Sequence, residues 1–371
     1  MTVNCGWLRR FVPVLAVVLL GLPGVSHAQD ARTQIEQELS RVERAARTAS
    51  IPKEYWDEGK PRVLSGLASA RRDLEANRLY LALEEFLAAS MDLRALEFLA
   101  ANWEAAKKGM PAFEAEWSRA DLELRDLEQR YRGGNWASMP AALRALAEGS
   151  FGQARPLYQA SRGFAMTSPD TGFYYLGDSK AALEAALFCQ SLRFPPTPQS
   201  RGSRSSAPEI RRLEEKVLAA YKPPQSIDRH SGFIRINGTL KAAGELDEAQ
   251  LYDGALYKYL QALRVFALLD ARAPEADRAK DFREEISRLR ARLSSATADD
   301  SIVQLLLERA ESALDAAGGN SGAAGDPRTA QVLLKEVIPA YFAAVESAGG
   351  AVNSPAATAQ ITVTLVRWPY T

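Results

Sequence analysis

The stretch "EGSFGQARPLYQA", residues 148–160, places two aromatic residues and a small residue along one face of a helix. Phe151, Ala154 and Tyr158 lie three and four residues apart, and Ser161 follows after three more. Steps of three and four keep side chains on one stripe of an α-helix. A small residue between two large ones lets a neighbouring helix come close while the rings fill the space beside it. The stretch therefore predicts a closely packed helix that begins near Phe151.

The same spacing recurs in two other segments of the chain. "LYLALEEFLAA" and "YDGALYKYLQA" supply two further sets: Leu79, Ala82, Phe86 and Ala89 in the first, and Tyr252, Ala255, Tyr259 and Ala262 in the second. A looser copy surrounds Ala330, with Leu334 in the place of the aromatic residue. We therefore interpret the stretch as one copy of a repeated packing unit.

The intervals and an internal alignment support a repeat. Ala82 and Ala154 are 72 residues apart, close to twice a repeat length of about 34. Residues 67–89 and 240–262 align without gaps, share eight of 23 positions and bring Asn77 opposite Gln250. These matches predict two related lobes.

The alternation of small and aromatic residues resembles the second helix of a tetratricopeptide repeat, over about a third of the chain that follows residue 28. The resemblance implies an all-α solenoid of antiparallel helix hairpins whose extended surfaces bind peptides or partner proteins. The chain departs from the family pattern, because the tryptophan and the Leu-Gly pair of a good first helix are missing. The copies would be degenerate, and ordinary antiparallel helices with alanine contacts are the alternative.

Most of the remaining chain also predicts helix, including segments at 62–76, 139–148, 151–166 and 239–248, with short Gly- and Pro-containing breaks. Residues 195–208, "PPTPQSRGSRSSAP", are rich in proline and serine and predict a flexible linker. This linker would separate an N-terminal lobe at 29–194 from a C-terminal lobe at 209–350, followed by a tail at 351–371.

The first 28 residues have the layout of a secretory signal peptide. Arg9 and Arg10 precede an apolar run from Phe11 to Val25, and Ser26-His27-Ala28 offers a small-residue cleavage site. An uncleaved membrane anchor is the alternative, but the run has only 15 residues, fewer than the roughly 20 that span a bilayer. No later apolar run approaches that length. We therefore expect an exported protein, either periplasmic or secreted.

The composition gives little indication of chemistry. Removal of Arg9 and Arg10 leaves 44 basic against 46 acidic residues, a balance that does not favour nucleic acid as a partner. Cys189 and His230 are the only cysteine and histidine after residue 28, too few for a zinc site, and we expect a buried, inert thiol and a solvated histidine in a loop. Glu84 and Glu85 are interpreted as solvated surface. No metal, cofactor or catalytic residue is predicted.

One enzyme class remains as an alternative. "ESALDAAGGNSGAAG", residues 311–325, resembles the glutamate motif of lytic transglycosylases, in which Glu311 would act as the acid/base that breaks a glycan bond. The spacing is one residue short, and only 46 residues follow Gly325. We therefore expect a non-catalytic binding or assembly scaffold in the cell envelope, with a protein or peptide partner.

The tail carries the strongest strand signal in the chain. In "QITVTLVRWPYT", Ile361, Val363 and Leu365 share one face of the expected strand, and Trp368 lies on the other. A lone strand cannot satisfy its own backbone groups, so we expect this tail to dock on the second lobe or to bind a partner. A frayed terminus is the alternative.

Overall fold

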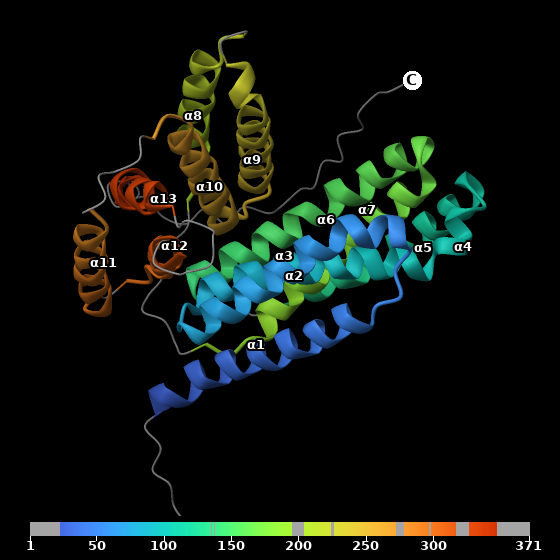
Figure 1. Ribbon diagram of the computed structural model, residues 1–371, viewed down its shortest axis with the longest axis horizontal. Coiled ribbons are helices and arrows are strands. Elements are labelled where there is room, and N and C mark those ends of the chain that lie inside the picture. The colour runs from blue at the N-terminus through green and yellow to red at the C-terminus, as the bar shows by residue number, and fades with distance from the viewer. Residues whose placement is uncertain are drawn as a thin grey trace, which may run out of the picture.

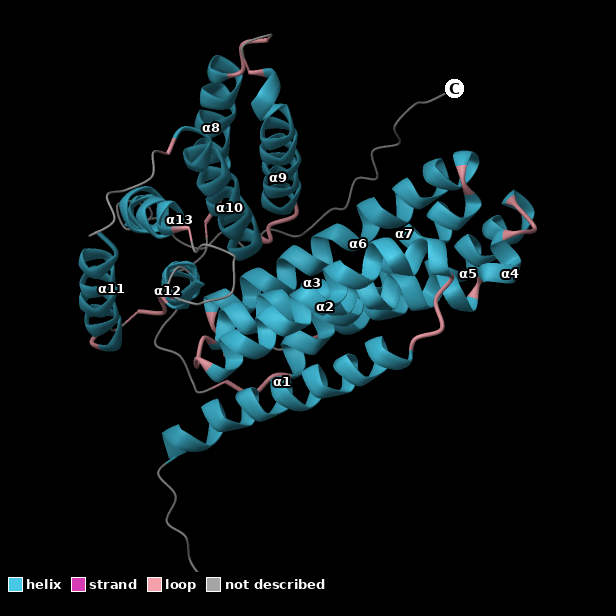
Figure 2. Cartoon of the chain, in the orientation of Figure 1, coloured by secondary structure: helices cyan, strands magenta, loops and turns pink. Residues whose placement is uncertain are grey.

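The fold is all-helical, as predicted. The computed structural model describes residues 23–134, 136, 138–194, 204–223, 226–271, 278–296, 298–316 and 326–346. Helices joined by short turns make up these ranges, which contain no β-strand (Figures 1 and 2). The described helices all fall short of the combined length and apolarity that a bilayer crossing requires.

The first half of the chain forms one long bundle with α1 lying along it (Figure 1). Its helices are α1 (Pro23–Thr48), α2 (Lys53–Glu75), α3 (Leu79–Ala101), α4 (Trp103–Ala106), α5 (Met110–Arg132), α6 (Ala141–Thr167) and α7 (Pro169–Ser191). Helix α1 shows why these segments pack together. Apolar residues recur along it at steps of three and four, so they form one face that is buried against the bundle: Ala31, Ile35, Leu39, Val42 and Ala46.

The second half adds shorter helices at one end of this bundle (Figure 1). They are α8 (Ala207–Ala220), the 3-10 turn η1 (Ile227–Arg229), α9 (His230–Glu248), α10 (Tyr252–Asp270), α11 (Arg278–Ser294), α12 (Ser301–Ala316), α13 (Pro327–Val332), η2 (Leu333–Val337) and α14 (Ile338–Glu346). The last three form one rod, and its π-helical turn η2 ends two residues before Pro339. A proline has no N–H, so one backbone hydrogen bond of the helix is missing. The wider π-helical turn lets the helix continue without that bond.

Helix hairpins bring the two halves together. The pairs α2–α3, α6–α7 and α9–α10 each pack along their lengths, and α10 also packs against α6. Helix α12 contacts both α3 and α6. One apolar core therefore runs from Ile35 in α1 to Ala344 in α14. The division into lobes at residues 195–208 stays a prediction.

The turns inside the α2–α3 and α9–α10 hairpins have the same backbone geometry. Asn77 and Gln250, which the internal alignment pairs, have positive φ angles of 61° and 62°. The following N–H groups, of Arg78 and Leu251, donate to carbonyls five residues back at 2.8 and 2.9 Å. This is the Schellman arrangement that ends a helix with one left-handed residue. The aligned segments thus fold into equivalent hairpins.

Among the helices whose N-cap residue makes no capping bond, α3, α6 and α10 are capped by residues far away in the sequence. Acidic side chains from distant helices and turns accept hydrogen bonds from the free N–H groups of these helices. The N–H of Leu81 donates to Glu308 (2.9 Å), that of Ala141 to Asp299 (2.7 Å) and that of Gly254 to Glu148 (2.6 Å). Leu81 and Gly254 are equivalent positions of the aligned hairpins. Caps of this kind satisfy buried donors and also tie helices of the two halves to each other.

Some predicted boundaries were wrong. The helix of the opening stretch does not begin near Phe151, because α6 runs unbroken from Ala141 through Gly149 and Ser150 to Thr167. Helix α2 begins at Lys53 and passes through Pro61, and α9 begins at His230 instead of residue 239. In each case tertiary packing keeps a locally weak segment helical.

Candidate functional site

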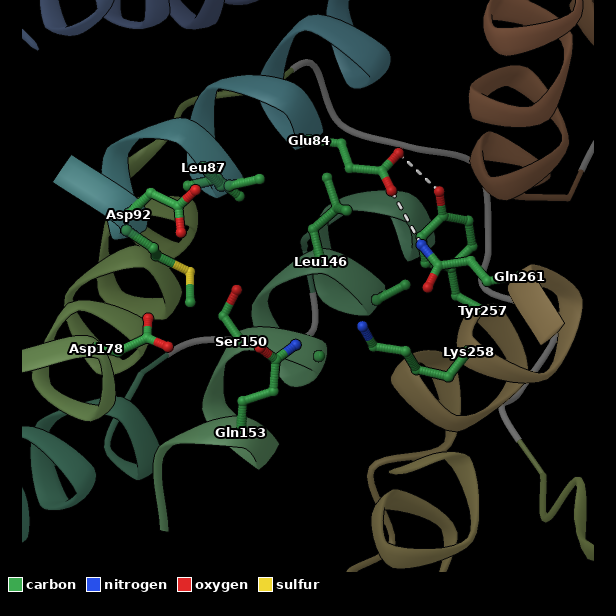
Figure 3. Close-up of a pocket in the computed structure, with 14 residues that line it drawn as sticks. Glu84, Leu87, Asp92, Leu146, Ser150, Gln153, Asp178, Tyr257, Lys258 and Gln261 are labelled. Carbon is green, nitrogen blue, oxygen red and sulfur yellow. Dashed lines mark hydrogen bonds between the residues drawn. The ribbon is translucent and has the colours of Figure 1, made fainter. Parts of the chain in front are cut away.

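A pocket of about 310 Å³ lies where the two halves of the chain meet. Helix α6 forms its floor, α3 and α7 form one wall, and α10 forms the opposite wall (Figure 3). Its lining mixes apolar side chains, such as Leu87, Met91 and Leu146, with polar groups from all four helices. Mixed linings and volumes of roughly 300–1,000 Å³ are typical of small-ligand sites.

Gly254 allows α6 and α10 to approach closely beside this pocket. A Cβ atom on Gly254 would lie 2.8 Å from Cβ of Glu148 and 3.2 Å from the backbone nitrogen of Gly149. A Cβ atom on Gly149 would lie 3.6 Å from Cε of Lys258, an ordinary contact distance, so the lysine stem runs close to α6 at this position. Gly149, in the opening stretch, therefore marks a helix crossing and not a helix start.

Glu84 closes one end of the pocket. Its carboxylate accepts hydrogen bonds from the Tyr257 hydroxyl at 2.7 Å and from Nε2 of Gln261 at 2.9 Å (Figure 3). It also forms an ion pair with Arg309 of α12. Burial alone would raise its pKa, but Arg309 and the Tyr257 hydroxyl hold the pKa below its usual value. In the aligned hairpins Tyr257 is the counterpart of Glu84, so equivalent faces of α3 and α10 meet here.

The interpretation of Glu84 and Glu85 as solvated surface was wrong. Glu84 is enclosed by α10 and α12, and burial together with the nearby Asp73 raises the pKa of Glu85 to about 8. Both glutamates follow the small residue of the repeated stripe. Their surroundings depend on which helices cross α3, and this cannot be read from the local charge pattern.

Lys258 and Asp178 are the charged groups of the pocket that have no partner among the described residues. Lys258 extends from α10 and Asp178 from α7, on opposite walls, with Ser150 and Gln153 between them (Figure 3). Both side chains are partly buried, and neither makes a hydrogen bond or ion pair with another described residue. Burial lowers the pKa of Lys258, with Glu84 opposing the effect. Burial and the adjacent Asp92 raise the pKa of Asp178 to about 6.

The residues predicted to pack the repeat lie beside the pocket, in the apolar core. Fully buried are Ala82, Phe86, Ala89, Ala154, Tyr158, Ala255, Tyr259 and Ala262, while Leu79, Phe151 and Tyr252 are partly buried. The Tyr158 ring stacks on Trp117 with centroids 4.5 Å apart. None of these residues lines the pocket, which occupies the face next to the repeated stripe. Their role as a repeat signature stays a prediction.

Other predicted residues lie apart from this site. Cys189 is a buried free thiol, and burial raises its pKa far above the usual range. His230 begins α9, where Nδ1 lies 2.9 Å from the Tyr221 hydroxyl, so the predicted loop is a helix start. Within the described ranges no cluster of acidic, histidine and cysteine side chains could hold a metal ion. Ile361, Val363, Leu365 and Trp368 lie outside the described residues, as does most of the predicted signal peptide.

Sequence reasoning missed Lys258 and Asp178. The one available signal was the internal alignment, which places Lys258 opposite Glu85, three residues after the repeated small residue, and Gln261 opposite Ala88. Comparisons with protein-family models, curated proteins and solved structures find no match to this chain.

Proposed function

We propose that the chain is a non-catalytic binding module whose ligand site is the pocket between α3, α6, α7 and α10. The observation that carries this proposal is the pair of unpartnered charges, Lys258 and Asp178, on opposite walls of a pocket whose other charged groups, Glu84 and Asp92, have partners. A partly buried charge without a partner is solvated less well than a charge on the open surface. Such groups persist where a ligand supplies the missing partner.

A peptide or a protein segment is the partner that this chemistry favours. The repeated stripe and the matching turns at Asn77 and Gln250 support degenerate, tetratricopeptide-like hairpins. Stacked hairpins of this kind present surfaces for extended chains. Within such a scaffold, the pocket would anchor one part of the partner.

Export is part of the proposal. Its support is the signal-like sequence of residues 1–28. The described side chains that α1 buries begin at Ala31, so cleavage after Ala28 would leave that buried face intact. The binding module would then act in the periplasm or outside the cell.

Glu311 lies outside the pocket and is held by arginine side chains. Its carboxylate accepts a hydrogen bond from Arg290 at 2.7 Å, and Nε of Arg78 lies 3.8 Å away. Burial raises the pKa of Glu311, and the two arginines limit the rise. A catalytic acid must face its substrate, whereas this carboxyl group is engaged by Arg290.

The binding proposal is tested by blocking the pocket from its rim. Ala88 is exposed and lines the pocket, so Ala88→Trp fills it without removing a buried side chain. Ala101, an exposed alanine at the end of the same helix, supplies the control Ala101→Trp. Residues 29–371 are incubated with a tripeptide library, and retained peptides are identified by mass spectrometry after gel filtration.

We expect retention by the unchanged protein and by Ala101→Trp, and a loss of at least about tenfold in Ala88→Trp because the tryptophan occupies the ligand volume. Failure of the unchanged protein to retain any peptide would contradict the proposal. Equal retention by both variants would place the binding site elsewhere.

A further inference from the structure

Lys258 is placed to receive an anionic group. Glu84, the carboxylate that acts electrostatically on this lysine, is already bonded to Tyr257, Gln261 and Arg309 and makes no ion pair with Lys258. The lysine stem runs beside Gly149 on the pocket floor. An ammonium group held in a partly buried position, with its hydrogen-bond donors unused, is matched by a ligand carboxylate.

Asp178 is placed to receive a cationic group at the other wall. Its neighbour Asp92 accepts hydrogen bonds from Arg62 at 2.8 Å and from the Tyr174 hydroxyl at 3.3 Å, whereas Asp178 has no such partner. Asp92 and Asp178 act on each other electrostatically, and Arg62 pairs with Asp92 alone, so the two carboxylates together carry excess negative charge. Binding of a ligand ammonium would relieve it.

The middle of the pocket suits a short peptide backbone. Ser150 and Gln153 offer hydrogen-bonding groups between the two charges, and Leu87, Met91 and Leu146 offer an apolar surface for a side chain (Figure 3). A volume of about 310 Å³ is at the lower end of the range of ligand sites. It fits a peptide of about two or three residues and not a folded surface.

We infer that the pocket binds short peptides with two free ends, taking the terminal carboxylate at Lys258 and the terminal ammonium at Asp178. This inference rests on the proposed binding function and adds the class of ligand and its orientation. It differs from recognition of an internal segment of a protein, which offers neither terminal charge.

The test uses four tripeptide libraries of identical composition: free at both ends, acetylated at the N-terminus, amidated at the C-terminus, and blocked at both ends. Acetylation removes the positive charge, and amidation removes the negative charge. We expect residues 29–371 to retain the free library at least about tenfold better than either singly blocked library, because each end loses a charge-assisted hydrogen bond.

Two variants assign the ends. Lys258→Met should abolish the preference for a free carboxylate, and Asp178→Asn should abolish the preference for a free ammonium, while each variant keeps the other preference. The exposed residues Lys241 and Asp126 provide the controls Lys241→Met and Asp126→Asn, which should keep both preferences. Circular dichroism checks that every variant is folded.

The outcomes separate this inference from the proposed function. Retention of the doubly blocked library at the level of the free library, lost in Ala88→Trp, would overturn the terminal recognition and leave the binding site in place. Retention of no library would overturn both. Loss of both preferences in Lys258→Met alone would overturn the assignment of the ammonium to Asp178.

Discussion

Glu84 joins three helices through one carboxylate, because it contacts Tyr257 and Gln261 in α10 and Arg309 in α12. Glu84→Ala leaves Arg309 largely buried without its anion, and loss of one partner from a buried pair costs about 3–5 kcal/mol. Urea unfolding should show a loss of that order in the free energy of unfolding. Glu114→Ala serves as the control, since its pair with Arg162 is exposed and should cost less than about 1 kcal/mol. Similar costs for both variants would mean that Glu84 does not connect the halves.

At the scale of helices, the caps supplied from a distance decide how α3 and α10 begin. Glu148 accepts the Gly254 N–H at 2.6 Å. Glu148→Ala leaves that donor unsatisfied, at a cost of roughly 1–3 kcal/mol, whereas Glu148→Gln keeps an acceptor oxygen and should cost much less. Urea unfolding compares the two variants, and hydrogen exchange at Gly254 should accelerate in the alanine variant only. Equal destabilisation by both would show that the charge matters and the cap does not.

Also at this scale, local pattern predicted the helices and the repeated hairpin, but not their crossings. The steps around Ala82 and Ala255 follow from the helical period, and the alignment pairs Asn77 with Gln250, whose φ angles agree. At Gly149 the low helix propensity of glycine predicts a break that the structure does not have. The role of Gly149 depends on α10, which lies about a hundred residues later. The pocket charges were missed for the same reason.

For the whole molecule, buried carboxyl groups set the dependence of stability on pH. Burial is the main cause that raises the pKa of Glu85 and of Glu148 to about 8, of Glu308 to about 7 and of Asp178 to about 6. In an unfolded chain these groups titrate near pH 4. Between these values the folded protein binds more protons than the unfolded chain. The stabilisation from these protons is complete below about pH 4 and is lost as the pH rises through the folded pKa values.

The melting temperature of residues 29–371 should therefore fall between pH 5.0 and pH 8.5, as measured by circular dichroism at constant ionic strength. Carboxylates whose pKa is lowered, such as Glu84 and Asp121, titrate below this window and do not offset the trend. Glu148→Gln removes one raised group while keeping an acceptor for Gly254, so its profile should be flatter, and the difference from the unchanged protein should be largest near pH 8. A melting temperature that stays level or rises across the window would show that these carboxyl groups reach solvent in the folded protein. The four carboxyl groups lie on α3, α6, α7 and α12. Exposure of these groups to solvent would therefore also contradict the close association of the two halves at the pocket.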